Sequence, residues 1–71
     1  MATSITAHIT GTVWKVVKAV GDRVEQDEAV VILESMKMEL PVESPAAGKV
    51  TEIRCAPGDA VEEGAVLAVI E

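Results

Sequence analysis

The heptapeptide Glu34-Ser35-Met36-Lys37-Met38-Glu39-Leu40 lies at the centre of the chain and joins two halves that resemble one another. When the sequence is shifted by 37 residues, Gly11 falls on Gly48 and Gly21-Asp22 falls on Gly58-Asp59. Self-similarity at a fixed spacing indicates that one supersecondary unit has been copied, so that the copies cover each other's apolar faces.

We therefore expect a single domain over residues 1–71, with repeat halves at about 5–36 and 38–71. A chain of 71 residues is near the lower limit for a self-sufficient core and leaves no room for a second domain. Its hydrophobic fraction of 49% is carried mainly by Val and Ala, with Trp14 as the single aromatic residue. A lone aromatic on a β-domain is more often a packing residue or a surface anchor than a platform for a ligand.

Short runs of alternating or β-branched residues separated by turn signals predict strands, and no segment shows a helical stripe of useful length. Ile5 to Ile9 has the two-residue period of a half-buried edge strand, and Ala29 to Glu34 is typical of a strand buried on both faces. The same criteria predict strands at 12–18, 39–43, 49–54 and 66–70, and a turn with a short strand at 20–24 and again at 57–61. We expect an all-β fold of about eight short strands in two antiparallel sheets, a flattened barrel or sandwich with quasi-two-fold symmetry.

No recognisable catalytic set or metal-ligand spacing is present. His8 is the only histidine and Cys55 the only cysteine, which leaves neither a disulfide nor a metal cluster. We interpret Cys55 as a small packed or partly exposed thiol and His8 as a solvated edge residue. Asp22 and Asp59 could be imagined as a carboxylate dyad, but a turn role explains both Gly-Asp pairs.

Charge and apolar runs in the sequence predict which partners and which location suit the chain. The formal net charge is −6, and the six basic residues are dispersed, so a nucleic-acid partner is not expected. The longest apolar run, Ala29 to Leu33, is too short to cross a bilayer. The N-terminus shows no basic region followed by an apolar run, and the single cysteine suits a reducing compartment, so we expect a cytoplasmic location.

Lys37 places a primary amine at the join, where a hairpin tip usually carries Gly, Asn or Asp. An ordinary solvated turn lysine is the simplest interpretation of such a residue. Its position at the centre of the repeat favours a functional role instead.

Together with both Gly-Asp turns and Pro45-Ala46-Ala47-Gly48-Lys49-Val50, the heptapeptide resembles the biotinyl/lipoyl attachment domain family over nearly the whole chain. In the biotin branch the modified lysine lies in a Met-Lys-Met triplet, which corresponds here to Met36, Lys37 and Met38. The resemblance implies that biotin is attached to Lys37, that Met36 and Met38 serve ligase recognition, and that Glu34 and Ser35 flank the site. Ser35 stands where Ala is usual.

The resemblance also implies a hammerhead-like fold with the lysine on a tight hairpin, and a carrier role. A biotin protein ligase would supply an acyl-adenylate, since a lysine amine is mostly protonated near neutral pH. The attached biotin would then move carboxyl groups between biotin carboxylase and carboxyltransferase sites. The domain itself would be no enzyme but a ligase substrate, with no catalytic residue and no metal.

Two alternatives stay open at this point. Lipoyl domains commonly carry an Asp-Lys-Ala triplet after Glu and Ser or Thr, so Glu34-Ser35 is compatible with lipoate and a lipoate ligase, whereas Met36 and Met38 are not. The other alternative is an unmodified β-module that binds protein partners. It predicts that Lys37 stays free in cells that contain both ligases and both cofactors.

Overall fold

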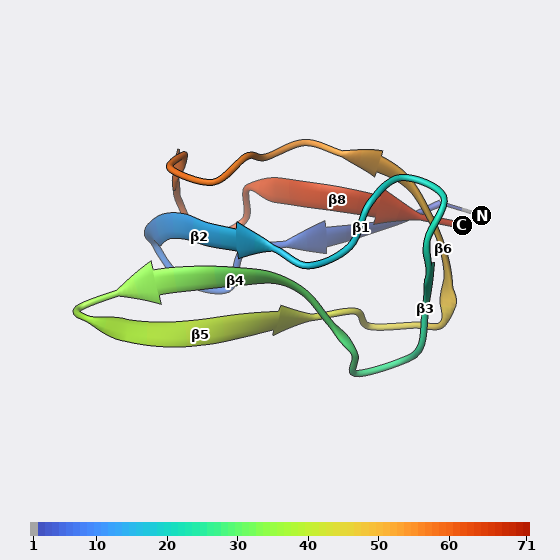
Figure 1. Cartoon of the computed structure of the whole chain (residues 1–71), viewed down its shortest axis with the longest axis horizontal. Helices are drawn as coiled ribbons and strands as arrows, with labels where there is room; N and C mark the ends of the chain where they lie inside the picture. Colours follow the sequence, from blue (N-terminus) through green and yellow to red (C-terminus); the bar gives the residue numbers. More distant parts are fainter. Residues whose placement is uncertain (1) are drawn as a thin grey trace.

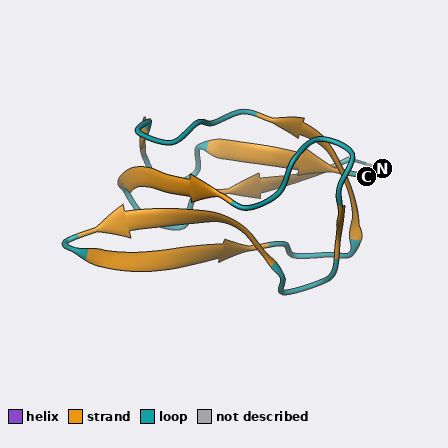
Figure 2. Ribbon diagram, viewed as in Figure 1, coloured by secondary structure: helices purple, strands orange, loops and turns teal. Residues whose placement is uncertain are grey.

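The computed structural model describes residues 2–71 of the chain. These residues form eight strands and no helix (Figure 2). The strands form two antiparallel four-stranded sheets, with the orders β1-β8-β6-β3 and β5-β4-β2-β7, which confirms the expected fold class. Over this range no helix is long and apolar enough to span a membrane. The strands are β1 (Thr3–Thr6), β2 (Gly11–Val16), β3 (Arg23–Val24), β4 (Ala29–Ser35), β5 (Met38–Glu43), β6 (Gly48–Ile53), β7 (Ala60–Val61) and β8 (Val66–Ile70).

The molecule is elongated, with principal extents of 33 × 17 × 17 Å. Figure 1 shows both chain ends at one end of the long axis and the connection between β4 and β5 at the other. The pairing of Thr3 with Ile70 in β1 and β8 joins the two ends of the chain. The β4–β5 hairpin therefore projects away from both termini.

The repeat in the sequence is also a repeat in the structure. Strands β2, β3 and β4 correspond to β6, β7 and β8 at the same shift of 37 residues, and β1 corresponds to β5. The hydrogen bonds between the halves repeat as well. The Gly21 N–H donates to the Val50 carbonyl at 2.8 Å, and the Gly58 N–H donates to the Val13 carbonyl at 2.8 Å.

Both Gly-Asp pairs form the same turn. Gly21 and Gly58 have φ values of 96° and 94°, which glycine adopts at little cost. The Asp22 carboxylate accepts a hydrogen bond from the backbone N–H three residues earlier at 2.9 Å, and Asp59 does the same at 2.9 Å. These contacts account for both carboxylates as turn residues.

The core lies between the sheets and consists of aliphatic side chains, half of which are valines. Removing each valine from water contributes roughly 1.5 kcal/mol, so stability depends on close packing of the whole set. The buried hydrophobic residues are Ile5, Ala7, Val13, Val24, Val30, Val31, Leu33, Val42, Val50, Leu67, Ala68 and Ile70.

The prediction of a first strand at 5–9 was wrong in its bounds, because β1 spans Thr3–Thr6. Alternation continues past the strand, but the backbone at Ala7 leaves the ladder. Its N–H donates to the Ala65 carbonyl at 2.9 Å, and its carbonyl accepts from the Gly64 N–H at 2.8 Å. Ala7 thus anchors the loop that precedes β8 instead of extending β1.

Strand β4 was expected to be buried on both faces, and that prediction was also wrong in part. Val31 and Leu33 are fully buried, but Ile32 between them is only partly buried and Glu34 is exposed. The chain forms only two sheets, so the outer face of the β4 sheet has no third layer to cover it.

Candidate functional site

The turn between β4 and β5 contains only two residues. Ser35 pairs with Met38 as the last rung of the ladder, so Met36 and Lys37 alone close the hairpin. The strand predicted at 39–43 therefore begins one residue earlier than expected, because Met38 already belongs to β5. Met36 and Lys37 have φ values of 52° and 65°, the left-handed conformation that a type I′ turn requires at both central positions.

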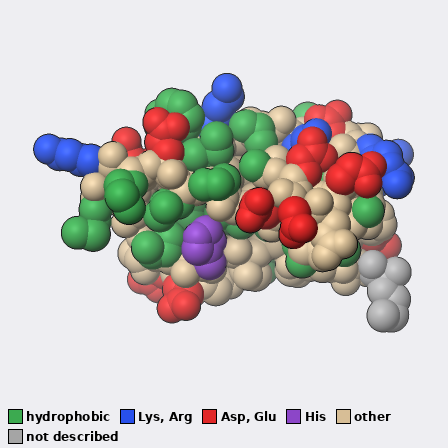
Figure 3. All heavy atoms as spheres, turned by 90° about the horizontal axis from the view of Figure 1, so that it is seen from below, with side chains coloured by type: hydrophobic (Ala, Val, Ile, Leu, Met, Phe, Trp, Pro, Cys, Tyr) green, Lys and Arg blue, Asp and Glu red, His purple; other side chains and the backbone are tan. Residues whose placement is uncertain are grey.

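Lys37 and its two methionine neighbours all face solvent. The exposed fractions of Met36 and Met38 are 91% and 59%, and Lys37 is exposed as well. Within residues 2–71 the Lys37 amine takes part in no ion pair or side-chain hydrogen bond. Figure 3 shows a Lys or Arg side chain projecting beyond the rest of the molecule at the hairpin end. This arrangement leaves the amine open to a visiting enzyme from several directions.

Two carboxylates lie directly behind the turn. Glu34 and Glu39 are opposite each other across the β4–β5 ladder, and both are exposed. Like charges in directly opposed positions destabilise a sheet slightly. Ser35, which the sequence placed among the flanking residues, is partly buried beside them. The site residues expected from the sequence are thus brought together in one hairpin.

The hairpin rests on a well-packed base. β4 lies between β5 and β2 in its sheet, so it is hydrogen-bonded on both sides. Its inward side chains Val31 and Leu33 are fully buried, opposite Val42 and Leu40 of β5. A base of this kind holds the backbone of Lys37 in place, while its side chain extends into solvent.

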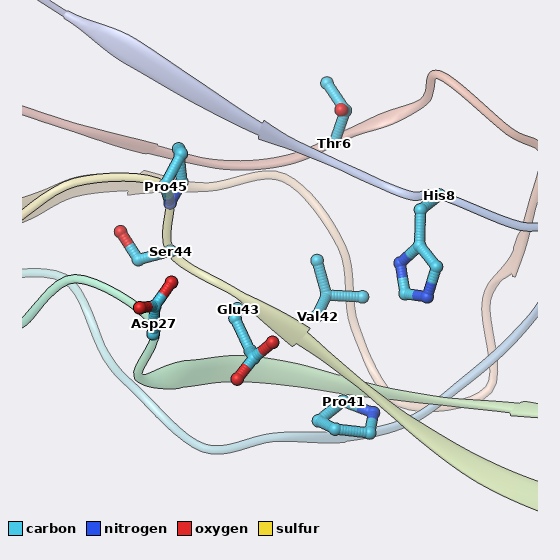
Figure 4. A pocket seen from close by; sticks show the side chains of 8 residues that line it. All are labelled: Thr6, His8, Asp27, Pro41, Val42, Glu43, Ser44 and Pro45. Atoms are coloured by element: carbon cyan, nitrogen blue, oxygen red, sulfur yellow. The ribbon is translucent and has the colours of Figure 1, made fainter.

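An open hollow of about 350 Å³ lies at the opposite end of β5 from the turn. In Figure 4 the His8 ring faces Val42 and Pro41, while Asp27 and Ser44 lie toward the other end of the hollow. Its lining comes from separate segments of the chain, so no local pattern of residues predicts it. Across residues 2–71 no cluster of His, Cys, Asp or Glu side chains is arranged to hold a metal ion.

Cys55 is partly buried in the connection between β6 and β7. Burial raises the pKa of its thiol, and the nearby negative charge of Asp59 raises it further. Because the thiolate is the reactive form, these surroundings make Cys55 a poor nucleophile.

Comparison with known proteins gives consistent matches. The family model described as "Biotin-requiring enzyme" matches residues 1–70. The biotin/lipoyl attachment protein of Bacillus subtilis is 42% identical over 64 residues, which cover 90% of this chain and 88% of that protein. The "Biotinylated protein TB7.3 homolog" of Mycobacterium leprae is 40% identical over 70 residues, covering 99% of both.

Larger proteins contain similar regions. The crystal structure of the Kluyveromyces lactis urea carboxylase superposes on the whole of this chain with a TM-score of 0.94 and 44% identity, although the matching region is only 6% of that chain. A dihydrolipoyllysine-residue acetyltransferase component of the pyruvate dehydrogenase complex, from Mycoplasma pneumoniae, is 41% identical over 61 residues. This match covers 86% of the present chain and 15% of that protein.

Proposed function

The chain belongs to the biotinyl/lipoyl attachment domain family, and from that premise we propose that it is a biotin carrier modified on Lys37. A biotin protein ligase would attach the cofactor. The carrier would then serve a biotin-dependent carboxylase by moving carboxyl groups between its carboxylase and carboxyltransferase sites. A cytoplasmic location remains a prediction from the sequence.

One structural observation carries this proposal. Lys37 is the second residue of a two-residue turn, exposed at the end of the molecule farthest from the chain termini (Figure 1). Its amine has no partner among the described side chains, so acylation breaks no ion pair or hydrogen bond of the fold. The residues present therefore fit a covalently attached group.

The attachment step requires an activated acyl donor from outside the domain. The neutral amine of Lys37 attacks the carbonyl carbon of the biotinyl-adenylate, the new C–N bond forms, and the C–O bond to the AMP leaving group breaks. The proton lost from the amine passes to a base of the ligase. No described side chain lies within hydrogen-bonding distance of Lys37 to take that proton, so the base must come from the ligase.

After attachment, biotin would supply the group that accepts a carboxyl group at one site and releases it at another. The domain contributes reach and positioning. The lysine stem adds to the cofactor's own chain, and tethering raises the effective concentration of the cofactor at both sites. The exposed Met36 and Met38 would form a polarizable rim that adapts to different enzyme surfaces.

Lipoylation of Lys37 is a second candidate, with acyl or aminomethyl groups as the cargo. Glu34 and Ser35 fit the lipoyl pattern, and lipoyl-bearing proteins are among the relatives that match most of the chain. Met36 and Met38 favour biotin instead. An unmodified interaction module would show neither adduct.

Incubation of the purified apo-domain with a biotin protein ligase, biotin and ATP tests the proposal. We expect a mass gain of one biotinyl group on wild type and none on Lys37→Arg. A parallel reaction with lipoate ligase, lipoate and ATP compares the second candidate. Because the Lys37 side chain is exposed, Lys37→Arg should unfold at the same urea concentration as wild type. Biotin on the Lys37→Arg variant would contradict the assignment.

A further inference from the structure

The outer side of the lysine-bearing sheet carries four apolar residues at positions where the copy carries three polar residues and one valine. Trp14 and Val17 of this face have exposed fractions of 47% and 37%. We call the outer residues Trp14, Val17, Ile32 and Pro41 the apolar outer face. The shift of 37 residues places Thr51, Arg54, Val69 and Ser4 on the equivalent face of the second sheet.

Register places Trp14, Ile32 and Pro41 side by side, and Val17 follows the end of β2. Ile32 of β4 pairs with Pro41 of β5, and neither points into the core, since the flanking Leu33 is fully buried. On the other side of β4, Lys15 pairs with Ile32 and the ladder shifts between Val13 and Lys15, so Trp14 is the additional residue of a bulge beside this pair. A bulge redirects its extra side chain without disturbing the rest of the sheet.

The second half supplies an internal control for the role of Trp14. At the equivalent bulge, the Thr51 hydroxyl donates a hydrogen bond to the Val69 carbonyl at 3.2 Å, which shows that a side chain here lies next to the β8 position equivalent to Ile32. The same backbone therefore forms with a small polar residue. The exposure of Trp14 is not a requirement of the fold.

The apolar outer face is continuous with the hairpin tip. Ile32 precedes Ser35 by three residues, a distance of about 10 Å along a strand. A standard interface covers about 800 Å² on each partner, which is wide enough to include both the face and the tip. Figure 3 shows hydrophobic side chains gathered on the half of the molecule that carries the tip, with most carboxylates toward the other half.

We propose that the apolar outer face is the docking surface for the ligase that acylates Lys37, with Trp14 as its aromatic anchor. This inference rests on the proposed function. Before modification, only the four-carbon stem of Lys37 separates its amine from the turn. The acylating enzyme must therefore approach the hairpin closely, whereas a carboxylase meets a longer arm and can stay clear of the sheet.

The two carboxylates near the tip also support a ligase as the partner. Glu34 and Glu39 lie between the apolar outer face and the tip, and neither takes part in an ion pair within residues 2–71. A ligase surface with an apolar pocket for Trp14 and basic groups opposite these two carboxylates would match both features. Such complementarity mainly speeds encounter and fixes orientation.

Steady-state biotinylation tests the anchor. Trp14→Thr installs the residue that the copy carries, and we expect kcat/KM for the ligase to fall about tenfold or more, as for an aromatic anchor at an interface. Val17→Arg likewise installs the residue of the copy and should also lower kcat/KM. The matched control is Arg54→Val on the opposite sheet, which should leave kcat/KM unchanged. An equal rate for Trp14→Thr and wild type would overturn the proposal.

A direct readout uses Trp14 as the single tryptophan. The Lys37→Arg chain is labelled with 5-fluorotryptophan, and unlabelled ligase is added with biotin and ATP. The one ¹⁹F resonance should shift or broaden in proportion to bound ligase. An unchanged resonance at saturating ligase would overturn the proposal. A change that follows the chain's own concentration without ligase would overturn it too, by assigning the face to a second copy.

Different results would contradict the proposed function and the docking surface. If wild type accepts no biotin from an active ligase, the proposed function fails. If wild type is biotinylated but neither Trp14→Thr nor the ¹⁹F resonance responds, only the docking surface fails. Equal urea unfolding of Trp14→Thr and wild type shows that a slower reaction does not arise from loss of fold.

Discussion

Gly11 of β2 lies against the carbonyl group of Glu34 in β4, so close that a Cβ atom at position 11 would stand 2.7 Å from that oxygen. The second half repeats this contact, because a Cβ atom at position 48 would stand 2.7 Å from the carbonyl oxygen of Glu71. Both glycines are needed because a neighbouring backbone approaches, and not because of an unusual φ. In the first half the contact lies directly behind the turn that carries Lys37.

Gly11→Ala should therefore destabilise the protein by about 1–3 kcal/mol, since the added methyl group must displace hydrogen-bonded backbone. Urea unfolding at equilibrium measures this change. Gly48→Ala is the matched comparison and should cause a similar loss, because its added methyl group would meet the Glu71 backbone, which is hydrogen-bonded to Lys49. A Gly11→Ala variant as stable as wild type would show that the two strands separate at little cost.

The turn itself holds a smaller strain. Met36 is an unbranched residue with a φ of 52°, a region that Asn occupies more readily. We expect Met36→Asn to raise the free energy of unfolding by up to about 1 kcal/mol. Met38→Asn is the control, because Met38 lies in a strand and Asn has low strand propensity, so stability should fall there. Thermal unfolding of both variants measures these changes. If Met36→Asn does not raise the unfolding temperature, the turn is unstrained.

Much of this fold follows from the repeat and the residue types in the sequence. The copied Gly-Asp pairs predict two equivalent turns, and Gly21 and Gly58 adopt nearly equal φ values. The run from Ala29 to Leu33 predicts the central strand because β-branched residues favour a pleated surface. The placement of Lys37 at a tight hairpin follows from its position between two predicted antiparallel strands.

Other features depend on tertiary contacts that the sequence does not encode locally. Alternation through Ile9 gives no sign that Ala7 leaves β1 to bind the loop before β8. Asp27 has a φ of 69° although it is not a glycine, and only its copy, Gly64 with a φ of 91°, indicates the conformation. The bulge that exposes Trp14 comes from the ladder register between β2 and β4.

The two methionines should set the choice of cofactor. Met36→Asp together with Met38→Ala converts the triplet to the lipoyl pattern, and we expect biotinylation to fall and lipoylation of Lys37 to appear. Competing reactions with both ligases, followed by intact mass, measure the ratio of adducts. A double variant that remains a good biotin acceptor and gains no lipoate would show that the specificity lies elsewhere on the surface.

Acid should weaken the fold partly through Glu28. The Lys18 amine, 2.8 Å from Glu28, lowers the pKa of that carboxyl, and the hydrogen bond from the Glu25 N–H lowers it further. A lowered pKa in the folded state stabilises the fold above the ordinary value of 4.5 and loses this contribution as the pH falls through the lowered pKa. Glu28→Gln should therefore show a shallower loss of unfolding free energy on acidification.

The control for this pH effect is Glu63→Gln, which removes an exposed carboxylate that forms no ion pair within residues 2–71. Its urea midpoint should change with pH as that of wild type does. Parallel acid profiles for Glu28→Gln and wild type would mean that the Lys18–Glu28 pair contributes nothing in solution, as many exposed ion pairs do.

The proposed function depends on biotin being attached to Lys37. Intact mass of the protein purified from its native host, followed by peptide mapping across the β4–β5 hairpin, measures this attachment. We expect one biotinyl adduct per chain, located on Lys37. A lipoyl adduct there would move the protein to the other branch of the family, and an unmodified Lys37 in a host with active ligases and both cofactors would contradict the carrier role.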